Sequence, residues 1–319
     1  DVAMVVFFFL VGIEIKRELV LGELSSVRQA AVPVAAALGG MLLPLAIFLL
    51  IAREPEVRDG WGVPMATDIA FALGVLAVAA PRAPQGLRSF LLTLAIVDDV
   101  GAILLIALAY TEGIDPVALA IAVGSALAIA SAPRIGLRSP WILGALGVVL
   151  WGATLASGVH AAIAGVAFAF LLPVGVASSA LERLEAALHP WTSRFVVPVF
   201  ALANAGVRVV DADAGALLRD PVVLGVVAGL VVGKFPGISG ATAIALRAGL
   251  GRLPDGVTPR DVPAVAAVAG IGFTVSLFIA ELAFPEGFGA DAARVGILLA
   301  SLLAGLVGAA LLRRVPVRG

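Results

Sequence analysis

The sequence predicts an all-α, polytopic membrane protein, because the chain is far more apolar than a soluble protein of its size. Of its 319 residues, 61% are hydrophobic and 13% are charged, and the mean hydropathy is +1.11. Soluble domains carry about one quarter charged residues. Lipid offers no partner to open backbone groups, so spanning segments are helices or closed barrels. The short alternating strands of a barrel are absent from the sequence, which leaves helices.

Eleven apolar segments, separated by short polar turns, are the predicted helices. They cover residues 2–13, 27–52, 61–80, 87–110, 115–132, 140–156, 158–176, 194–209, 221–247, 261–284 and 291–312. A spanning helix needs about 20 residues, which most of these segments approach or exceed. Because the turns are short, we expect residues 1–319 to form a single transmembrane domain.

The positions of Lys and Arg predict the orientation, because these residues concentrate in cytoplasmic loops. Of the 21 Lys and Arg residues, fifteen fall in one set of alternate loops, five fall in the other, and Lys234 lies within a segment. This bias predicts a cytoplasmic C-terminus and places Asp1 outside. Segment 2–13 is short for a span and lacks the features of a signal peptide. We therefore expect that a first helix and the start of this one are missing.

One connecting stretch, residues 178–192, differs from the other turns. Its leucines recur at helical spacing opposite charged residues, which predicts a short amphipathic helix on the cytoplasmic side that ends at Pro190. A plain connecting turn is the alternative.

Four ionisable residues lie in the middle of apolar segments, namely Asp68, Asp98, Asp99 and Lys234. A charge at the centre of a bilayer costs about 2.5–3.5 kcal/mol, so such groups face a bundle interior or a cavity and pair with one another. One ammonium cannot neutralise three carboxylates, so at least one carboxylate needs a proton or a cation. This shortage of positive partners predicts a site at which a small cation and protons compete. A helix break that leaves Asp98 and Asp99 near an interface is the alternative.

Two apolar segments contain residues that interrupt a helix. Pro64, Thr67 and Gly74 lie around Asp68, and a second segment holds Gly270, Gly272 and Thr274 at its middle. Interrupted segments at corresponding positions of two halves indicate a transporter site. Segments 27–52, 61–80 and 87–110 form one trio with a broken middle member, and 221–247, 261–284 and 291–312 form another. The loop charges make the two trios an inverted repeat, in which Asp68 would compensate helix N-ends and Lys234 helix C-ends. Close helix packing is the alternative explanation for the two glycines.

The composition also excludes several kinds of chemistry. The chain has no cysteine, which rules out thiol chemistry, disulfides and cysteine-ligated metals, and it has two histidines far apart. A net charge of −1 gives no indication of nucleic-acid binding. We expect no cofactor, and the partners expected are the transported ions and the lipid bilayer.

Three other functions fit parts of the pattern. A sodium-coupled solute symporter would need a larger cavity with more polar residues than the segments hold. An intramembrane aspartyl protease needs two facing aspartates from separate helices, and Lys234 and the absence of a Gly-x-Gly-Asp motif argue against it. A passive channel would differ from an exchanger by the lack of coupled counterflow.

Eight stretches carry a resemblance to a known family. They are FFFLVGIEIKRELVLGEL, ATDIAFALG, LAIVDDVGAI, SGVHAAIAGV, LHPW, FALANAGV, VVGKFPGIS and GIGFTVSLFIA, in this order across nearly the whole chain. Together they closely resemble the NhaA family of sodium/proton antiporters. The resemblance implies a twelve-helix fold with two crossed, interrupted helices, of which eleven helices are present here and the first of them is partial. It also implies a dimerisation hairpin in the part of the protein that precedes Asp1, so a homodimer is expected of the full-length protein.

The resemblance also assigns roles to residues. It implies that Asp99 is the main cation-binding and proton-exchanging carboxylate, and that Asp98 alternates between Lys234 and the ion. Thr67 looks like a nearby oxygen ligand of the ion, and Asp68 looks like the balance for the crossed helix ends.

Further residues match a cytoplasmic pH-response region of the family, namely Glu14, Glu18, Glu185 and His189. Without the resemblance, these four would be read as solvated loop charges. His160 also matches the family, but a simple polar contact is an equal explanation.

The predicted function is therefore exchange of cytoplasmic Na⁺ or Li⁺ for external H⁺ by alternating access, and not an enzymatic reaction. Hard oxygen ligands suit such ions. The resemblance implies two protons per sodium, hence electrogenic and pH-regulated transport that serves sodium and pH homeostasis in the bacterial inner membrane.

Overall fold

The computed structural model describes residues 2–111, 113–137, 139–172, 188, 190–206, 214–284 and 288–316. These ranges contain helices and connecting turns and no strand, so the all-α prediction is confirmed. By internal contacts the chain divides into two compact units. Unit 1 comprises Asp1–Arg17 and Ile103–Phe200, and unit 2 comprises Glu18–Ala102 and Ala201–Gly319. The prediction that residues 1–319 form a single domain stays a prediction.

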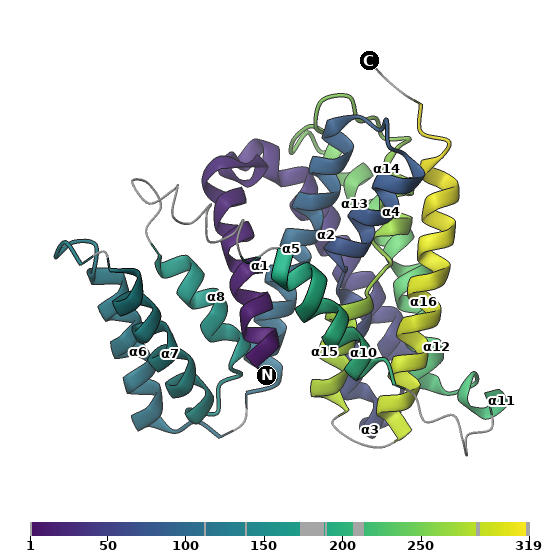
Figure 1. Ribbon diagram of the computed structural model, residues 1–319. Coiled ribbons are helices and arrows are strands. Elements are labelled where there is room, and N and C mark those ends of the chain that lie inside the picture. Colours follow the sequence, from purple (N-terminus) through teal and green to yellow (C-terminus); the bar gives the residue numbers. More distant parts are fainter. Residues whose placement is uncertain are drawn as a thin grey trace. The chain divides into compact units, whose positions relative to one another are not determined.

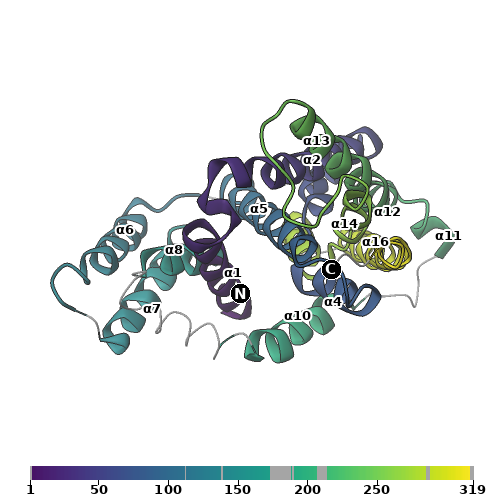
Figure 2. The same cartoon turned by 90° about the horizontal axis from the view of Figure 1, so that it is seen from above.

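Unit 1 is built mainly of short apolar helices (Figure 1). It contains α6 (Pro116–Ser131), α7 (Pro140–Ala156), α8 (Ala162–Leu171), the π-helical turn η3 (Thr192–Val196), most of α1 (Val2–Leu21), and the first residues of α10 (Val197–Asn204). Helices α6 and α7 lie side by side (Figures 1 and 2). Helix α6 begins where its residues dictate, because Asp115 accepts hydrogen bonds from the backbone of Val117 and Ala118 and Pro116 needs no N–H partner.

The end of α8 is capped by a side chain from α1. The ammonium of Lys16 donates hydrogen bonds to the carbonyl oxygens of Phe170, at 2.7 Å, and of Leu172. The last carbonyls of a helix have no partner within the helix, and a cation there also interacts favourably with the helix dipole. Lys16 therefore anchors α8 to α1 within unit 1.

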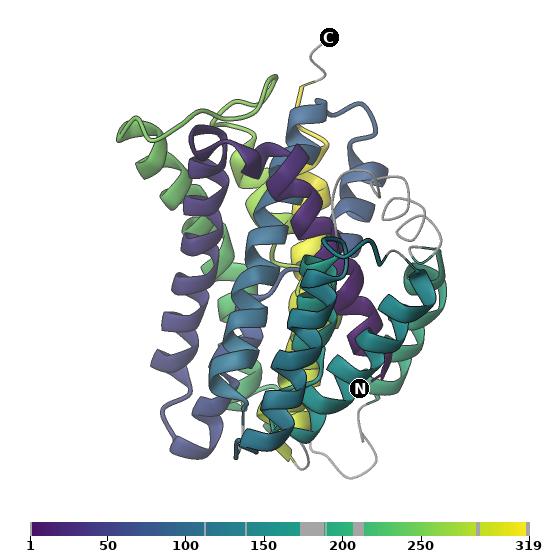
Figure 3. The same cartoon turned by 90° about the vertical axis from the view of Figure 1, so that its left-hand side faces the viewer.

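Unit 2 holds the long helices and both interrupted ones. Its elements are η1 (Glu23–Ser25), α2 (Val27–Ile51), α3 (Pro55–Arg58), η2 (Asp59–Met65), α4 (Ile69–Ala79), most of α5 (Gln85–Ala109), α11 (Ala214–Leu217), α12 (Pro221–Val227), the π-helical turn η4 (Ala228–Gly233), α13 (Lys234–Arg247), α14 (Val262–Val268), α15 (Phe273–Ala283) and α16 (Phe288–Leu312). Its long helices run roughly along one direction (Figure 3).

The described residues contain four helices that are long and apolar enough to cross a membrane, and six spans if each bent helix pair counts as one. The four are Val27–Ile51, Gln85–Ala109, Pro221–Arg247 and Gly289–Leu312. The bent pairs are Pro55–Met65 with Ile69–Ala79, at 47°, and Val262–Val268 with Phe273–Ala283, at 48°. Both predicted trios, each a long helix, a broken helix and a long helix, are therefore present, and both predicted breaks are confirmed.

Two elements differ from the predicted boundaries, and a third lies almost entirely outside the described residues. Helix α1 continues to Leu21, so Glu14 and Glu18 lie on a helix and not in a loop. In the described part of the predicted segment 158–176, which is residues 158–172, only Ala162–Leu171 is α-helical, because Gly158 with φ 82° ends α7 in the left-handed conformation. The predicted amphipathic helix at 178–192 falls almost entirely outside the described residues.

Helices α2 and α13 lie side by side (Figures 1 and 2) and approach closely through glycine. A Cβ atom on Gly237 would overlap with the carbonyl oxygen of Gly39, and a Cβ on Gly39 would overlap with that of Gly237. Between apolar helices in lipid, small residues allow the backbone contact that provides packing energy. The two glycines thus set the distance between α2 and the helix that carries Lys234.

We expect Gly237→Ala to lower the free energy of unfolding by about 1–3 kcal/mol, because the added methyl group overpacks the contact with Gly39. The matched control is Gly240→Ala on the same helix, where no atom lies within 4 Å of an added Cβ. That control should be neutral or gain about 0.5–1 kcal/mol. Thermal unfolding of both variants in detergent provides the measurement, and equal midpoints would contradict the packing assignment.

Candidate ion-binding site

A buried ion pair lies at the centre of unit 2. The ammonium of Lys234, at the start of α13, is 2.6 Å from Oδ2 of Asp98 on α5, and both side chains are fully buried. The apolar residues around Asp98 fold as one continuous helix, α5. Charges in such a position remain ionised only when they are paired. The structure therefore brings together two of the four intramembrane charges that the sequence singles out.

Thr67 joins this ion pair to an interrupted helix. Its hydroxyl accepts a hydrogen bond from Lys234 at 2.8 Å and lies 2.6 Å from Oδ2 of Asp98 and 2.8 Å from the carbonyl oxygen of Ala269. A hydroxyl has one proton to donate. Thr67 can therefore donate to Asp98 or to the carbonyl at the C-terminal end of α14, but not to both at once.

Asp68, the next residue, satisfies the N-terminal ends of two helices. Its Oδ1 accepts from the backbone N–H of Phe71 at the start of α4, at 3.1 Å. Its Oδ2 accepts from the backbone N–H and the hydroxyl of Thr274 at the start of α15, at 3.0 and 2.5 Å. The backbone N–H of Asp68 in turn donates to the carbonyl of Ile271, at 2.7 Å. One carboxylate thus ties together the two breaks at their positive ends.

Two serines add to the crossing and were not predicted. The hydroxyl of Ser276 on α15 donates to the carbonyl of Val63 in η2, at 2.8 Å. The hydroxyl of Ser301 on α16 accepts from the backbone N–H of Phe273, at 3.2 Å. Breaking a helix exposes backbone groups that lipid cannot satisfy, so polar side chains must serve them. The signal was available in the sequence as isolated hydroxyl residues inside apolar segments.

Asp99 is also buried, with 2% of its surface exposed. Neighbouring residues of a helix point about 100° apart, so Asp99 faces a different direction from Asp98. Oδ1 of Asp98 is buried and accepts no hydrogen bond from the described residues. The region thus combines a paired carboxylate oxygen, a buried oxygen that is open to a further partner, and a second buried carboxylate.

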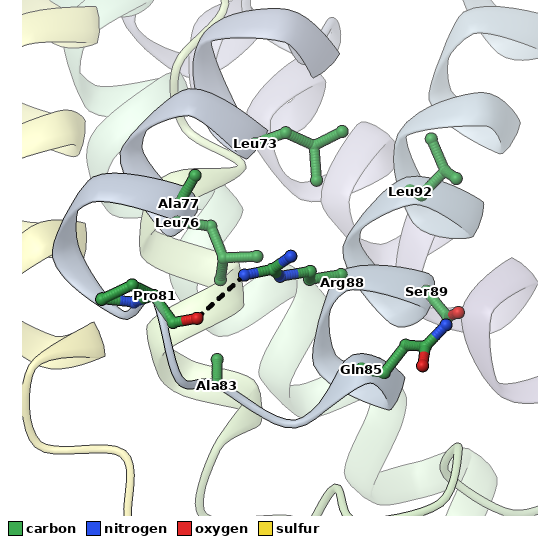
Figure 4. A pocket seen from close by; sticks show the side chains of 9 residues that line it. All are labelled: Leu73, Leu76, Ala77, Pro81, Ala83, Gln85, Arg88, Ser89 and Leu92. Carbon is green, nitrogen blue, oxygen red and sulfur yellow. Dashed lines mark hydrogen bonds between the residues drawn. The ribbon is translucent and has the colours of Figure 1, made fainter. Parts of the chain in front are cut away.

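A cavity of about 580 Å³ lies between α4 and α5 (Figure 4). Apolar side chains line it from both helices, and Gln85, Arg88 and Ser89 contribute polar groups near the start of α5. Arg88 donates a hydrogen bond to the carbonyl of Pro81 across the turn that joins the helices, at 3.1 Å. Leu92, which lines the cavity, precedes Asp99 by seven residues and so shares its face of the helix. The cavity therefore lies on the same face of α5 as Asp99, about two helical turns away from it.

Of the residues predicted to form a pH-response region, the structure describes Glu14 and Glu18. Glu18 is buried, and its Oε1 accepts from the hydroxyl of Thr93 on α5 and from the backbone N–H of Glu23, both at 2.9 Å. Glu14 is half-buried on α1. Glu185 and His189 lie outside the described residues. His160 is half-buried in the turn before α8, where its Nδ1 accepts from the backbone N–H of Ala162.

Crossed, interrupted helices with buried charges at their crossing define a polytopic secondary transporter for small ions. A family model described as Na⁺/H⁺ antiporter 1 matches residues 1–312. The chain belongs to this antiporter family, and so it is a transporter and not an enzyme.

Named relatives agree with the family model. The Na⁺/H⁺ antiporter NhaA 2 of Pseudomonas syringae pv. syringae (strain B728a) is 47% identical over 330 residues, covering 100% of this chain and 83% of the relative. The Na⁺/H⁺ antiporter NhaA of Shewanella baltica (strain OS185) is 47% identical over 314 residues, covering 97% of this chain and 80% of the relative. The similarity extends over the whole set of spans, including both interrupted helices.

We expect Thr274→Val to lower the free energy of unfolding by about 1–3 kcal/mol, because the buried carboxylate of Asp68 loses a hydrogen-bond donor. Thr274→Ser keeps the hydroxyl and should restore most of the loss. Thr242→Val is the matched control, since the hydroxyl of Thr242 is buried with no hydrogen-bond partner among the described residues. Thermal or denaturant unfolding checks this, and equal effects at 274 and 242 would contradict the role of Thr274.

Proposed function

We propose that this protein exchanges Na⁺ for H⁺ at a site formed by Asp98, Asp99 and Thr67, with Lys234 as the exchangeable partner of Asp98. The observation that carries the proposal is the buried pair of Lys234 and Asp98 at the crossing of two interrupted helices. Family membership supports the ions exchanged.

The count of buried charges supports competition between a cation and protons. In the part of unit 2 that the structure describes, Lys234 is the buried cation at the crossing, against the carboxylates of Asp68, Asp98 and Asp99. The helix N-ends compensate Asp68, since three N–H or O–H donors from α4 and α15 reach it. The ammonium of Lys234 contacts Asp98, and Asp99 is a second buried carboxylate on the same helix. A proton or a Na⁺ ion that binds to these carboxylates competes with the ammonium.

The available oxygens suit an alkali cation. Oδ1 of Asp98 is open to a further partner, Asp99 adds a carboxylate, and the hydroxyl of Thr67 lies 2.6 Å from Oδ2 of Asp98. These are hard oxygen donors, with no sulfur or nitrogen ligand required. When Na⁺ binds, Asp98 leaves Lys234 for the ion, and Thr67 turns its proton to the carbonyl of Ala269. Li⁺ binds to the same oxygens.

Exchange follows because the same carboxylates cannot hold the cation and the protons together. In the inward-facing state at alkaline pH, the carboxylates lose their protons and take up Na⁺. Movement of one bundle relative to the other then exposes the ion to the outside, where protons displace it. Two protons per sodium make the cycle electrogenic.

The cavity between α4 and α5 supports a route from one side of the membrane. It lies beside the turn that holds Arg82 and the start of α5, which holds Arg88, and the charge bias assigns both arginines to the cytoplasm. By the same bias the C-terminus is cytoplasmic, in a bacterial inner membrane. We also propose a homodimer, which the resemblance to the NhaA family implies.

The pH response is assigned to the region that contains Glu14, Glu18, Glu185 and His189. The hydrogen bond between Glu18 and Thr93 supports this assignment, because Thr93 lies on the helix that carries both site carboxylates.

We expect Asp99→Asn to abolish Na⁺-driven proton movement, because the amide cannot release a proton or provide a charged ligand. The measurement is the pH change inside proteoliposomes when Na⁺ is added outside. Asp115→Asn is the matched control, because Asp115 is an exposed cap that asparagine can replace. Sodium-driven proton movement that persists in Asp99→Asn would refute the site.

Lys234→Ala tests the proposed pairing. It leaves Asp98 buried without its counter-charge, so we expect a loss of about 3–5 kcal/mol in stability unless Asp98 takes up a proton. It should also shift the pH dependence of exchange. Unchanged stability together with an unchanged pH profile would remove Lys234 from the mechanism.

A further inference from the structure

The turn that precedes Lys234 is not α-helical. Residues Ala228–Gly233 form a π-helical turn between α12 and α13. The backbone N–H of Lys234 itself closes this turn by donating to the carbonyl of Gly229, five residues back. A π-turn holds one more residue than an α-turn. It therefore rotates the side chains of the residues that follow by about 100° around the helix axis. The direction of the Lys234 side chain therefore depends on this turn.

The residues nearby explain why the helix widens here. Pro236 has no N–H, and its ring would clash with the carbonyl of Val232 in a regular α-helix. Gly229 and Gly233 lie within the wider turn and have no side chain to obstruct it. Pro236 and Val232 are both exposed, so neither is fixed by burial in the core. The cause of the π-turn is thus local and can be removed without loss of buried contacts.

Four glycines show that the turn corrects the register of the whole helix. Their spacing is four residues, and added Cβ atoms would lie 2.7 Å from Phe48 for Gly225, 3.3 Å from the carbonyl of Pro44 for Gly229, 2.9 Å from Cα of Pro44 for Gly233, and in overlap with Gly39 for Gly237. All of these contacts are with α2. In a regular α-helix, three steps of four residues drift by about 120° around the axis. The π-turn cancels most of that drift, so the glycine face stays on α2.

The same turn also contacts both interrupted helices. A Cβ on Gly229 would lie 2.6 Å from Cβ of Pro64 in η2. A Cβ on Gly270, at the second break, would lie 2.5 Å from the carbonyl oxygen of Leu230. The turn is therefore held between the two breaks, directly before the residue that reaches Asp98.

We propose that the π-turn Ala228–Gly233, held open by Pro236, is the positioning element that directs Lys234 into the ion-binding site. This rests on the proposed function of the pair of Lys234 and Asp98. Without the wider turn, Lys234 rotates by about 100° to the direction that Phe235 now occupies, which is 38% exposed. Pro236 is a positioning residue and does not touch the ion.

The experiment uses a loss and a rescue. Pro236→Ala lets the segment relax to an α-helix with one residue too many, which turns Lys234 away from Asp98. Pro236→Ala combined with deletion of Val232 removes the surplus residue and returns Lys234 to its present direction. Val232→Ala, which keeps the length, is the control. Each background is examined with Lys234 and with Lys234→Ala.

The first measurement is thermal unfolding, which is independent of transport. We expect Lys234→Ala to lower the midpoint in the original chain, in Val232→Ala and in the rescued variant, but not in Pro236→Ala. The second is the pH profile of Na⁺-driven proton movement. In Pro236→Ala it should match that of Lys234→Ala, and in the rescued variant it should return toward the original.

Three outcomes separate the possibilities. A Pro236→Ala variant that keeps both the stability cost of Lys234→Ala and the original pH profile would overturn the proposal. So would a Pro236→Ala variant that the deletion of Val232 fails to rescue, because its damage would then be general. If Lys234→Ala has no effect in the original chain, the pairing in the proposed function fails instead.

Discussion

The structure of unit 2 depends on the cost of keeping Lys234 and Asp98 charged away from water. Removing a carboxylate and an ammonium from water costs several kcal/mol each after relaxation, and only close geometry with further hydrogen bonds recovers it. Here the two charges are 2.6 Å apart, and Thr67 contacts both. The pair can form only where α5, α13 and the first interrupted helix meet. The glycine contacts between α2 and α13, together with the crossing of the two interrupted helices, hold these three elements in place.

The unpaired backbone groups at the two helix breaks would also be costly in an apolar environment, and polar side chains of the site bond to them. Breaking a helix in an apolar environment leaves backbone N–H and carbonyl groups without partners. Asp68 accepts hydrogen bonds from backbone N–H groups of both breaks that have no partner within their helix. Thr67 can donate its proton to the carbonyl of Ala269, which also lacks a partner within its helix. Asp68 is therefore fully engaged in structure. Its neighbour Thr67 connects the same break to the charges that are free to exchange partners.

Much of this arrangement could be predicted from residue types, because charge in lipid has few explanations. Asp68, Asp98, Asp99 and Lys234 predict the four buried charges. These residues and the clustered glycines also predict the two helix breaks and the two trios of a long, a broken and a long helix. The partners of Asp68 and of the broken helix ends could not be derived. Thr274, Ser276 and Ser301 are common residues in spans, and only the crossing gives them carboxylate, carbonyl and N–H partners. The π-turn was also missed. A hydropathy pattern does not reveal the one extra residue of a π-turn, although Pro236, two residues after Lys234, is a local signal for it.

The energetics of the pair explain why exchange of partners is feasible. A buried ion pair is close to break-even against uncharged packing, since desolvation offsets most of the attraction. A cation that replaces Lys234 at Asp98 therefore needs to match only a small net stabilisation. The ammonium moves on a flexible four-carbon chain, whereas the backbone that carries it is fixed by glycine contacts with α2. Movement of one side chain and one hydroxyl proton can thus change the charge of the site while the crossing of the helices is preserved. A stronger pair would hold the site in one state, and a looser scaffold would let the broken helices collapse when the pair opened.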